Sequence, residues 1–126
     1  MAGTLIADTL SNGISTADLN NISAGTAKAW CGFNGTGTLT IRKSYNVSSV
    51  TDVGVGIYRL NFTTVFPDSN YVVNASMGTG LNPGATADND AYCHLGEHLP
   101  ESFTLYVESA ADASYDRAYV SVVIFN

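Results

Sequence analysis

The chain has 126 residues, the length of one domain, and 45% of them are hydrophobic while only 13% are charged, which argues against a disordered chain. Gly, Ser, Thr and Asn together account for 48 residues, a mixture that favours turns and strands over long helices. The net charge is −6, the one adjacent basic pair is Arg42-Lys43, and no apolar run approaches the ~20 residues that cross a bilayer; we therefore expect no nucleic-acid partner and no membrane insertion.

The N-terminal residues predict a short strand followed by a linker. The strand is expected within Thr4–Leu10, and residues 11–26 are small and polar without periodicity. Residues 1–8 lack the basic and then apolar pattern of a signal peptide, so we expect the protein to be made in a cytoplasm. We divide the chain into an N-terminal attachment or linker segment, residues 1–26, and a β-sandwich domain, residues 27–126.

Alternation of apolar and polar residues recurs along residues 27–126 and predicts strands with one apolar face. Tyr58, Leu60 and Phe62, for example, alternate with polar or charged neighbours. In chain order the predicted strands cover 27–33, 38–42, 44–50, 58–63, 71–77, 91–95, 103–108 and 118–125. Short strands at this spacing predict an all-β fold, either an antiparallel β-sandwich or a partly closed, jelly-roll-like barrel.

Glycine, proline and asparagine mark the predicted turns between these strands. Asn34-Gly35 predicts a tight hairpin because both residues tolerate positive φ, and Asp52–Gly56 predicts the next hairpin. Pro67–Asn70 is typical of a turn with proline at its second position. The longest gap, Gly78–Asp90, predicts a surface loop of the length that often carries function.

Several apolar residues are assigned by residue type. Trp30, on a predicted strand, is expected to anchor the core. Cys31 and Cys93 are expected to be small buried residues rather than a disulfide, because a cytoplasm is reducing.

Apolar residues occupy both faces of the last predicted strand, 118–125. Such a strand must be covered on both faces: either a second copy of the chain covers one face, or the strand is central and a loop covers it. The candidate subunit-interface residues on the second face are Tyr119, Val123 and Phe125.

Several short motifs occur in a fixed order in the first half of the chain. They are Ala27-Lys28-Ala29-Trp30, Phe33-Asn34-Gly35-Thr36-Gly37-Thr38, Ile41-Arg42 and Asn46-Val47-Ser48-Ser49. This segment resembles a recurrent segment of bacteriophage tail-fibre proteins, and the opening Met1-Ala2-Gly3-Thr4 is similar to the start of such proteins in marine phages. The resemblance covers residues 1–75 and fades after Met77.

The resemblance implies an all-β, homotrimeric virion fibre that contacts the host surface. Because the sequence carries no enzyme motif, we expect this attachment to involve neither catalysis nor a cofactor. Its expected partners are further copies of the chain, other virion proteins and a host-surface glycan or protein. The protein would be assembled in the bacterial host cytoplasm and located in the virion. Two alternatives remain open: a structural virion protein, such as a capsid decoration, a head fibre or a tail adaptor, and a glycan-cleaving spike.

One departure from the resemblance adds interface candidates. Where the family carries polar residues around the second hairpin, this chain has Val53, Val55 and Ile57. Apolar side chains on a glycine-rich turn are unfavourable in water, so this turn is expected either to contact a neighbouring protein or to fold back onto its own core.

The sequence contains no convincing metal or catalytic motif. Cys93-His94 and Glu97-His98 form the one cluster with metal-ligating side chains, which would need a trimer axis to complete a tetrahedral site, so we predict no metal. Asp88-Asn89-Asp90 resembles a calcium-loop fragment but lacks the later acid and the glycine. No spacing links two carboxylates or a nucleophile and its base, so we predict no catalytic residues.

Receptor binding is therefore assigned to loops, which usually carry recognition when a rigid sheet holds them. Aromatic and amide side chains suit glycans because they offer an apolar face and planar hydrogen-bonding groups. Besides Tyr106, which lies beside these loops, the candidate receptor-binding residues are Asn82, Asp88, Asp90, Tyr92, His94, His98 and Tyr115.

Overall fold

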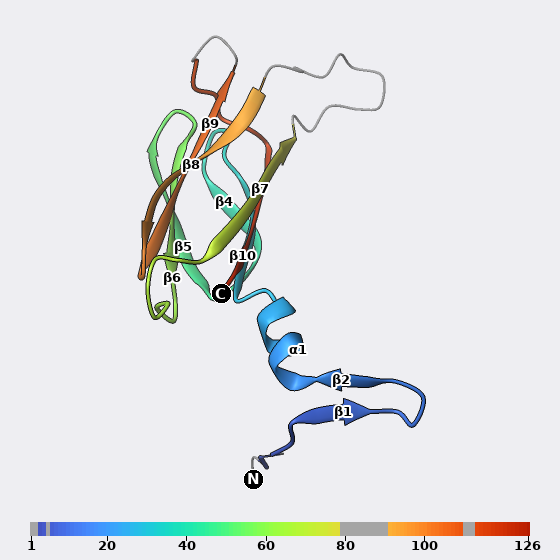
Figure 1. The fold of residues 1–126 in the computed structure, drawn as a ribbon. Coiled ribbons are helices and arrows are strands. Elements are labelled where there is room, and N and C mark those ends of the chain that lie inside the picture. The colour runs from blue at the N-terminus through green and yellow to red at the C-terminus, as the bar shows by residue number, and fades with distance from the viewer. Residues whose placement is uncertain (1–2, 5, 79–90, 110–112) are drawn as a thin grey trace.

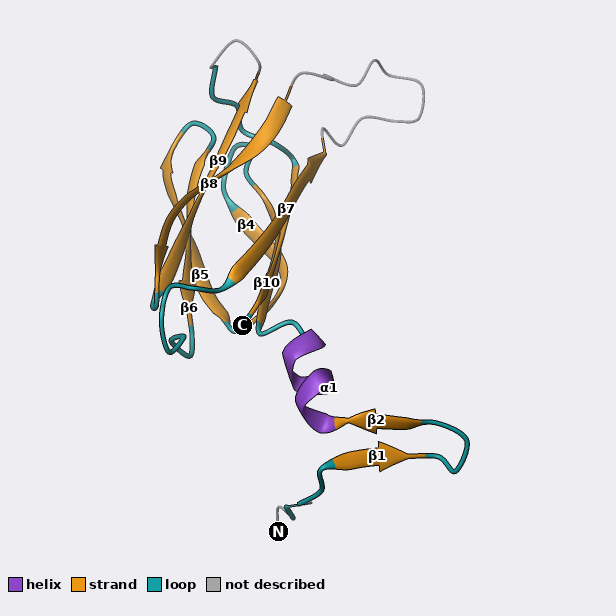
Figure 2. Ribbon diagram, in the orientation of Figure 1, coloured by secondary structure: helices purple, strands orange, loops and turns teal. Residues whose placement is uncertain are grey.

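The structure is a computed structural model of the 126-residue chain, and it describes residues 3–4, 6–78, 91–109 and 113–126. These residues contain ten β-strands and one short helix (Figures 1 and 2). No helix among them is long and apolar enough to cross a membrane.

Eight strands form two four-stranded antiparallel sheets that pack face to face (Figure 1). Sheet I contains, in spatial order, β4 (Thr40–Tyr45), β3 (Ala29–Asn34), β10 (Tyr119–Phe125) and β7 (Val72–Gly78). Sheet II contains β5 (Val47–Gly54), β6 (Ile57–Phe62), β9 (Ser102–Ser109) and β8 (Ala91–Leu99). The predicted all-β sandwich is confirmed, and of the two predicted architectures the sandwich is the one that forms.

The core lies between the two sheets and follows the alternation along the strands. Val122 of β10 pairs with Cys31 of β3 and Ala75 of β7, which places the three side chains on the inner face of sheet I. Burial of such apolar side chains is the main stabilising term of the fold. The fully buried set includes Ala29, Phe33, Tyr58, Leu60, Phe103, Leu105, Val107, Val120, Val122 and Ile124.

Trp30 is not a core anchor, contrary to the prediction. It pairs with Val123 and Tyr45 on the outer face of sheet I, whereas Ala29 and its second neighbour Cys31 face the core. Residues in β3 are apolar at consecutive positions, and a strand sends consecutive side chains to opposite faces. The residue type of Trp30 therefore does not show whether its side chain lies on the inner or the outer face of sheet I.

The hairpin predicted at Asn34-Gly35 also differs from the prediction in detail. β3 and β4 are neighbours, as expected, but residues 35–39 connect them. The positive φ falls on Gly37, at 63°, and not on Asn34-Gly35. In the second hairpin the positive φ falls on Gly56, at 68°, within the predicted turn.

The N-terminal region is more ordered than a linker. Strands β1 (Thr9–Ser11) and β2 (Thr16–Asp18) form a hairpin, and α1 (Leu19–Gly25) follows directly. The Asp18 side chain caps the helix by accepting a hydrogen bond from the Asn20 N–H at 2.7 Å. We call residues 6–26 the N-terminal arm; no residue in it is buried, and Figure 1 shows it projecting from the end of the sandwich at which the C-terminus lies.

Both cysteines are free thiols, as expected. Burial raises the pKa of the Cys31 thiol to about 11, so this thiol stays protonated and unreactive at neutral pH. Cys93 is half-buried against the core, and its pKa is raised for the same reason.

Candidate functional site

Tyr92 and His94 form an aromatic pair on the outer face of sheet II. Their ring centroids lie 4.7 Å apart on β8, close to the point where β8 begins. The cross-strand partners on β9 are Glu108 for Tyr92 and Tyr106 for His94. The Nε2 atom of His94 lies 3.9 Å from the Glu108 carboxylate, so a protonated His94 forms an ion pair there.

Gly96 allows Tyr106 to lie flat against the neighbouring strand. A Cβ atom at Gly96 would lie 2.4 Å from the Tyr106 ring and 2.8 Å from the Thr104 carbonyl oxygen. The strand pairing shifts between Leu95 and His98, which places this glycine in an irregular stretch of β8. The absence of a side chain at Gly96 therefore leaves the space that the tyrosine ring occupies.

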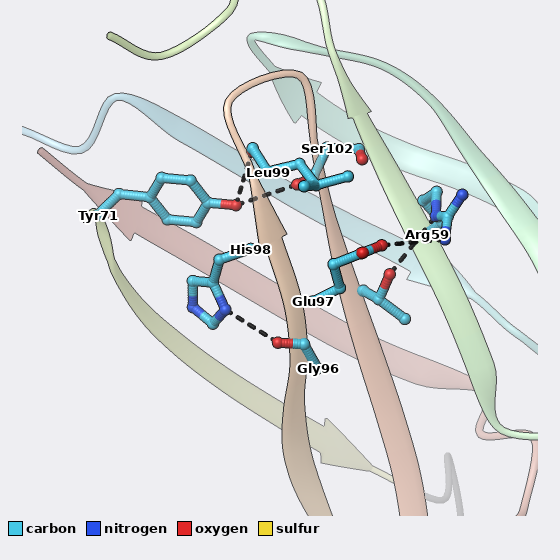
Figure 3. Close-up of polar contacts among 8 residues, drawn as sticks. Arg59, Tyr71, Gly96, Glu97, His98, Leu99 and Ser102 are labelled. Atoms are coloured by element: carbon cyan, nitrogen blue, oxygen red, sulfur yellow. Dashed lines mark hydrogen bonds and ion pairs between the residues drawn. The ribbon is translucent and has the colours of Figure 1, made fainter. Parts of the chain in front are cut away.

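An arginine and a glutamate extend this face toward the other end of the sheet (Figure 3). Arg59 of β6 lies 3.4 Å from the Glu97 carboxylate, and its Nε–H donates to the Thr104 hydroxyl at 3.5 Å. Both charged side chains are about half exposed, so the pair stabilises the fold by less than about 1 kcal/mol. Their polar groups stay accessible to a ligand. We call the whole set the aromatic–polar face: Arg59, Tyr92, His94, Glu97, Tyr106 and Glu108.

His98 lies beside Tyr71 (Figure 3) and belongs to an aromatic cluster other than the Tyr92–His94 pair. Its ring stacks on Tyr71 at 5.1 Å and meets Phe103 edge-on at 5.0 Å. Its Nδ1–H donates to the Gly96 carbonyl oxygen at 2.9 Å. The ring is thus held by packing, and of the two predicted histidines His94 is the one that is exposed.

No group of three or more His, Cys, Asp or Glu side chains that could hold a metal ion occurs within the part of the chain that the structure describes. Asn82, Asp88 and Asp90 lie outside the described residues.

Tyr115 lies beside Gly56, in the turn of the second hairpin, and not on β8. Its N–H donates to the Val107 carbonyl at 3.0 Å, and the Arg117 guanidinium stands 5.1 Å from its ring centroid. The preceding residue, Ser114, pairs with Glu108 of β9. The segment that carries Tyr115 therefore runs along the strand that supplies Glu108 to the aromatic–polar face.

Two of the three predicted interface residues on the second hairpin are exposed. Val53 is 54% exposed and Val55 is 60% exposed, while Ile57 is half-buried. The alternative in which this turn folds back onto its own core therefore does not hold for the two valines. The turn is nevertheless fixed, because the Gly56 N–H donates to Asp116 at 2.8 Å.

The outer face of sheet I carries a second apolar surface. β10 is a central strand, and its residues Val123 and Phe125 pair with Trp30 and Val72 on that face. We call the apolar end of the face the basal patch: Trp30, Tyr45, Val72, Val123 and Phe125. Tyr119 lies at the other end, with the Arg42 guanidinium 4.1 Å from its ring centroid.

A pocket of about 650 Å³ adjoins the basal patch. Asn46 shapes it: this residue has φ of 53°, its side-chain oxygen accepts the Thr64 N–H at 2.7 Å, and its amide donates to the Thr64 carbonyl. We call this cavity the basal pocket. Its walls consist of Lys28, Tyr45, Asn46, Thr63, Thr64, Val65, Phe66, Pro67 and Asn126. Sequence reasoning missed this pocket because its walls come from four separate stretches of the chain.

Taken together, the fold and these surfaces define a two-sheet antiparallel β-sandwich with a projecting N-terminal arm. Comparisons of the chain with protein-family models, with curated proteins and with solved structures find no match. The functional argument therefore depends on the residues themselves.

Proposed function

We propose that the protein is a phage virion fibre or tail-fibre protein that attaches to the host surface without catalysing a reaction. The observation that carries the proposal is the separation of two kinds of surface along the sandwich. The N-terminal arm leaves one end, and Tyr92 and His94 lie toward the opposite end, where β7 ends and β8 begins (Figure 1). A module that connects a virus particle to a cell needs one end that binds the particle and another end that binds the cell surface.

The chemistry of the aromatic–polar face suits a glycan. Tyr106 and Tyr92 offer aromatic surface, and Arg59, Glu97 and Glu108 offer charged hydrogen-bonding groups beside them. The Glu97 carboxylate is already paired with Arg59. The Asp116 carboxylate already accepts hydrogen bonds from Gly56 and Tyr58. This occupancy favours binding over hydrolysis, which requires two carboxylates poised on one sugar.

Assembly with further copies and with other virion proteins is part of the same proposal, with a homotrimer as the expected state. Trimers of attachment modules gain avidity, since several weak glycan contacts act together. The protein would then be located in the virion after assembly in the host cytoplasm.

The proposal is tested by imaging and by binding. Labelled antibody on virions is expected at the distal end of the tail, and the purified protein is expected to bind host cells. Tyr92→Ala, His94→Ala and Tyr115→Ala should each weaken cell binding, whereas Thr51→Ala, an exposed residue on another strand of the same sheet, should not. Unchanged binding by all three variants would remove these residues from the site.

A structural role in the virion is the second candidate, and the exposed aliphatic residues of the arm and of the second hairpin favour it. Val53, Val55 and Ile14 are suited to permanent protein neighbours rather than to a soluble sugar. Label on capsid faces or vertices would select this function over attachment. Release of reducing ends from purified capsule or lipopolysaccharide would instead indicate a glycan-cleaving spike.

A further inference from the structure

The turn of the N-terminal hairpin presents one isoleucine to solvent. Ile14 is 95% exposed at the tip between β1 and β2. The side-chain oxygen of Asn12 accepts hydrogen bonds from the N–H groups of Ile14, at 3.0 Å, and Ser15, at 2.8 Å. Gly13 supplies the positive φ, at 85°, that such a turn requires. The isoleucine is thus held outward on an ordered turn.

The arm that carries Ile14 lacks a core of its own. Four of its aliphatic residues, Ile6, Leu10, Ile14 and Ile22, are exposed, and a fifth, Leu19, is half-buried. A lone two-stranded hairpin and a seven-residue helix are each too small to be stable in isolation. The ordered conformation of the arm therefore requires a surface that covers these side chains.

The basal pocket has the shape and chemistry to receive the tip of this hairpin. Tyr45, Val65, Phe66 and Pro67 provide apolar walls, and Val65 is itself 61% exposed at present. The pocket is larger than one side chain, so a turn with its flanking backbone fits. It is also continuous with the basal patch through Tyr45, which lies beside Trp30 at a ring distance of 6.4 Å.

The N-terminal arm and the basal pocket carry opposite charges, so they are electrostatically complementary. The arm carries Asp8 and Asp18 and has no lysine or arginine. The pocket contains Lys28 and no acidic side chain, and Lys43 lies on the same face of sheet I as Tyr45. We propose that the N-terminal arm of one copy docks on a second copy of the chain, with Ile14 in the basal pocket and the rest of the arm along the basal patch.

The occupant is the arm of a second copy because the arm of the same chain is directed away. Lys28 donates from its ammonium group to the Ser23 carbonyl at 2.7 Å, and the Thr26 hydroxyl donates to the Ile22 carbonyl at 2.6 Å. These bonds fix the last turn of α1 against the first residues of the sandwich. The hairpin lies beyond the other end of α1 and runs crosswise to the sandwich, with its turn to the side and not toward the sheets (Figure 2). The seven residues of α1, at about 1.5 Å each, put it about 10 Å farther out.

Disulfide trapping between two differently marked chains tests this contact directly. Purified Ile14→Cys protein is mixed with Val65→Cys protein, oxidised mildly and analysed without reductant, with the joined peptides identified by mass spectrometry. We expect a 14–65 link between chains, well above the level obtained when Ile14→Cys is mixed with Thr38→Cys. Wild-type protein measures the background from Cys31 and Cys93. A 14–65 yield no higher than the control overturns the proposal.

A double variant separates exchange between copies from docking within one chain. If Ile14→Cys/Val65→Cys protein forms the 14–65 link within single chains at high dilution, the arm folds back onto its own sandwich and the proposal is wrong. Under exchange the linked product contains two or more chains and its yield rises with concentration.

Solution mass provides an independent readout. Ile14→Asp and Val65→Asp should each weaken assembly at least about tenfold, as expected for loss of an anchor residue. Asn20→Asp adds the same charge to the arm without removing an apolar side chain, so its mass should match the wild type. A wild-type chain that stays monomeric at all concentrations overturns the inference. The inference does not depend on host attachment, which is scored on cells and would fail separately.

Discussion

The carboxylate of Asp116 accepts a hydrogen bond from the buried hydroxyl of Tyr58 at 2.9 Å. The same oxygen accepts the Gly56 N–H at 2.8 Å, so one side chain connects the segment before β10 to the turn between β5 and β6. Burial, reinforced by Asp116, raises the pKa of Tyr58 and keeps the hydroxyl protonated as the donor.

Removing this carboxylate should destabilise the sandwich. Asp116→Ala leaves the Gly56 N–H without its acceptor and leaves the buried Tyr58 hydroxyl only the Gly35 carbonyl, at 3.4 Å. We therefore expect the free energy of unfolding to fall by about 1–3 kcal/mol, measured with urea. Asp68→Ala is the matched control, because Asp68 accepts a single N–H, from Asn70, on an exposed turn. The control should lose less than Asp116→Ala; equal losses would contradict the connecting role of Asp116.

The glycines of the second hairpin should differ sharply in their tolerance of a side chain. A Cβ atom at Gly56 would lie 2.5 Å from the Val107 carbonyl oxygen, and its φ of 68° disfavours any L-residue. Gly56→Ala should therefore cost about 1–3 kcal/mol of unfolding free energy. Gly54→Ala, two residues earlier, has nothing within 4 Å and should be nearly neutral. Thermal or urea unfolding of both variants checks this contrast, and equal effects would refute it.

Stability should decline at alkaline pH because of the buried tyrosines. Burial raises the pKa of Tyr71 to about 12, from an ordinary value of about 10. The folded state therefore holds this proton more tightly than the unfolded state, so its contribution is complete below pH 10 and is lost as the pH rises from 10 to 12. We expect the urea midpoint to fall over that range and to fall less steeply in Tyr71→Phe. A midpoint that is flat from pH 10 to 12 would contradict this assignment.

The exposed valines of the second hairpin predict an interface that mutation can break. Val53→Asp with Val55→Asp should reduce the assembly mass in solution or detach the protein from virions, since charge at an apolar contact is costly. The unfolding free energy of the separated chain should change by less than about 0.5 kcal/mol, because both sites are exposed in it. An unchanged mass both in solution and on particles would show that this turn contacts nothing.

The alternation of apolar and polar residues predicted most strands of the sandwich, because the buried apolar residues of β3, β6, β9 and β10 occupy every second position of each strand. Tyr58, Leu60 and Phe62 all face the core, and β10 buries Val120 and Val122 as the pattern requires. Where apolar residues stand next to each other the pattern loses this power, which is why Trp30 was assigned to the wrong face.

Features that depend on pairs of distant residues could not be predicted in this way. The role of Asp116 depends on contacts with residues about 60 positions away, at Gly56 and Tyr58. Glu108 joins Tyr92 through a cross-strand register that no local pattern reveals. Helix α1 was missed although Asp18 is a recognisable N-cap, because no apolar periodicity follows it.

The edge positions of β7 and β8 have a practical consequence. β7 is an edge strand of sheet I and β8 is an edge strand of sheet II, so each of these two consecutive strands pairs with a described strand on one side alone. The chain between them thus starts and finishes at the rim of the molecule, so a graft there need not thread through either sheet. Peptide epitopes or affinity tags inserted between Gly78 and Ala91 would be displayed without disturbing the strand order, making this rim a natural point for re-engineering the specificity of the scaffold.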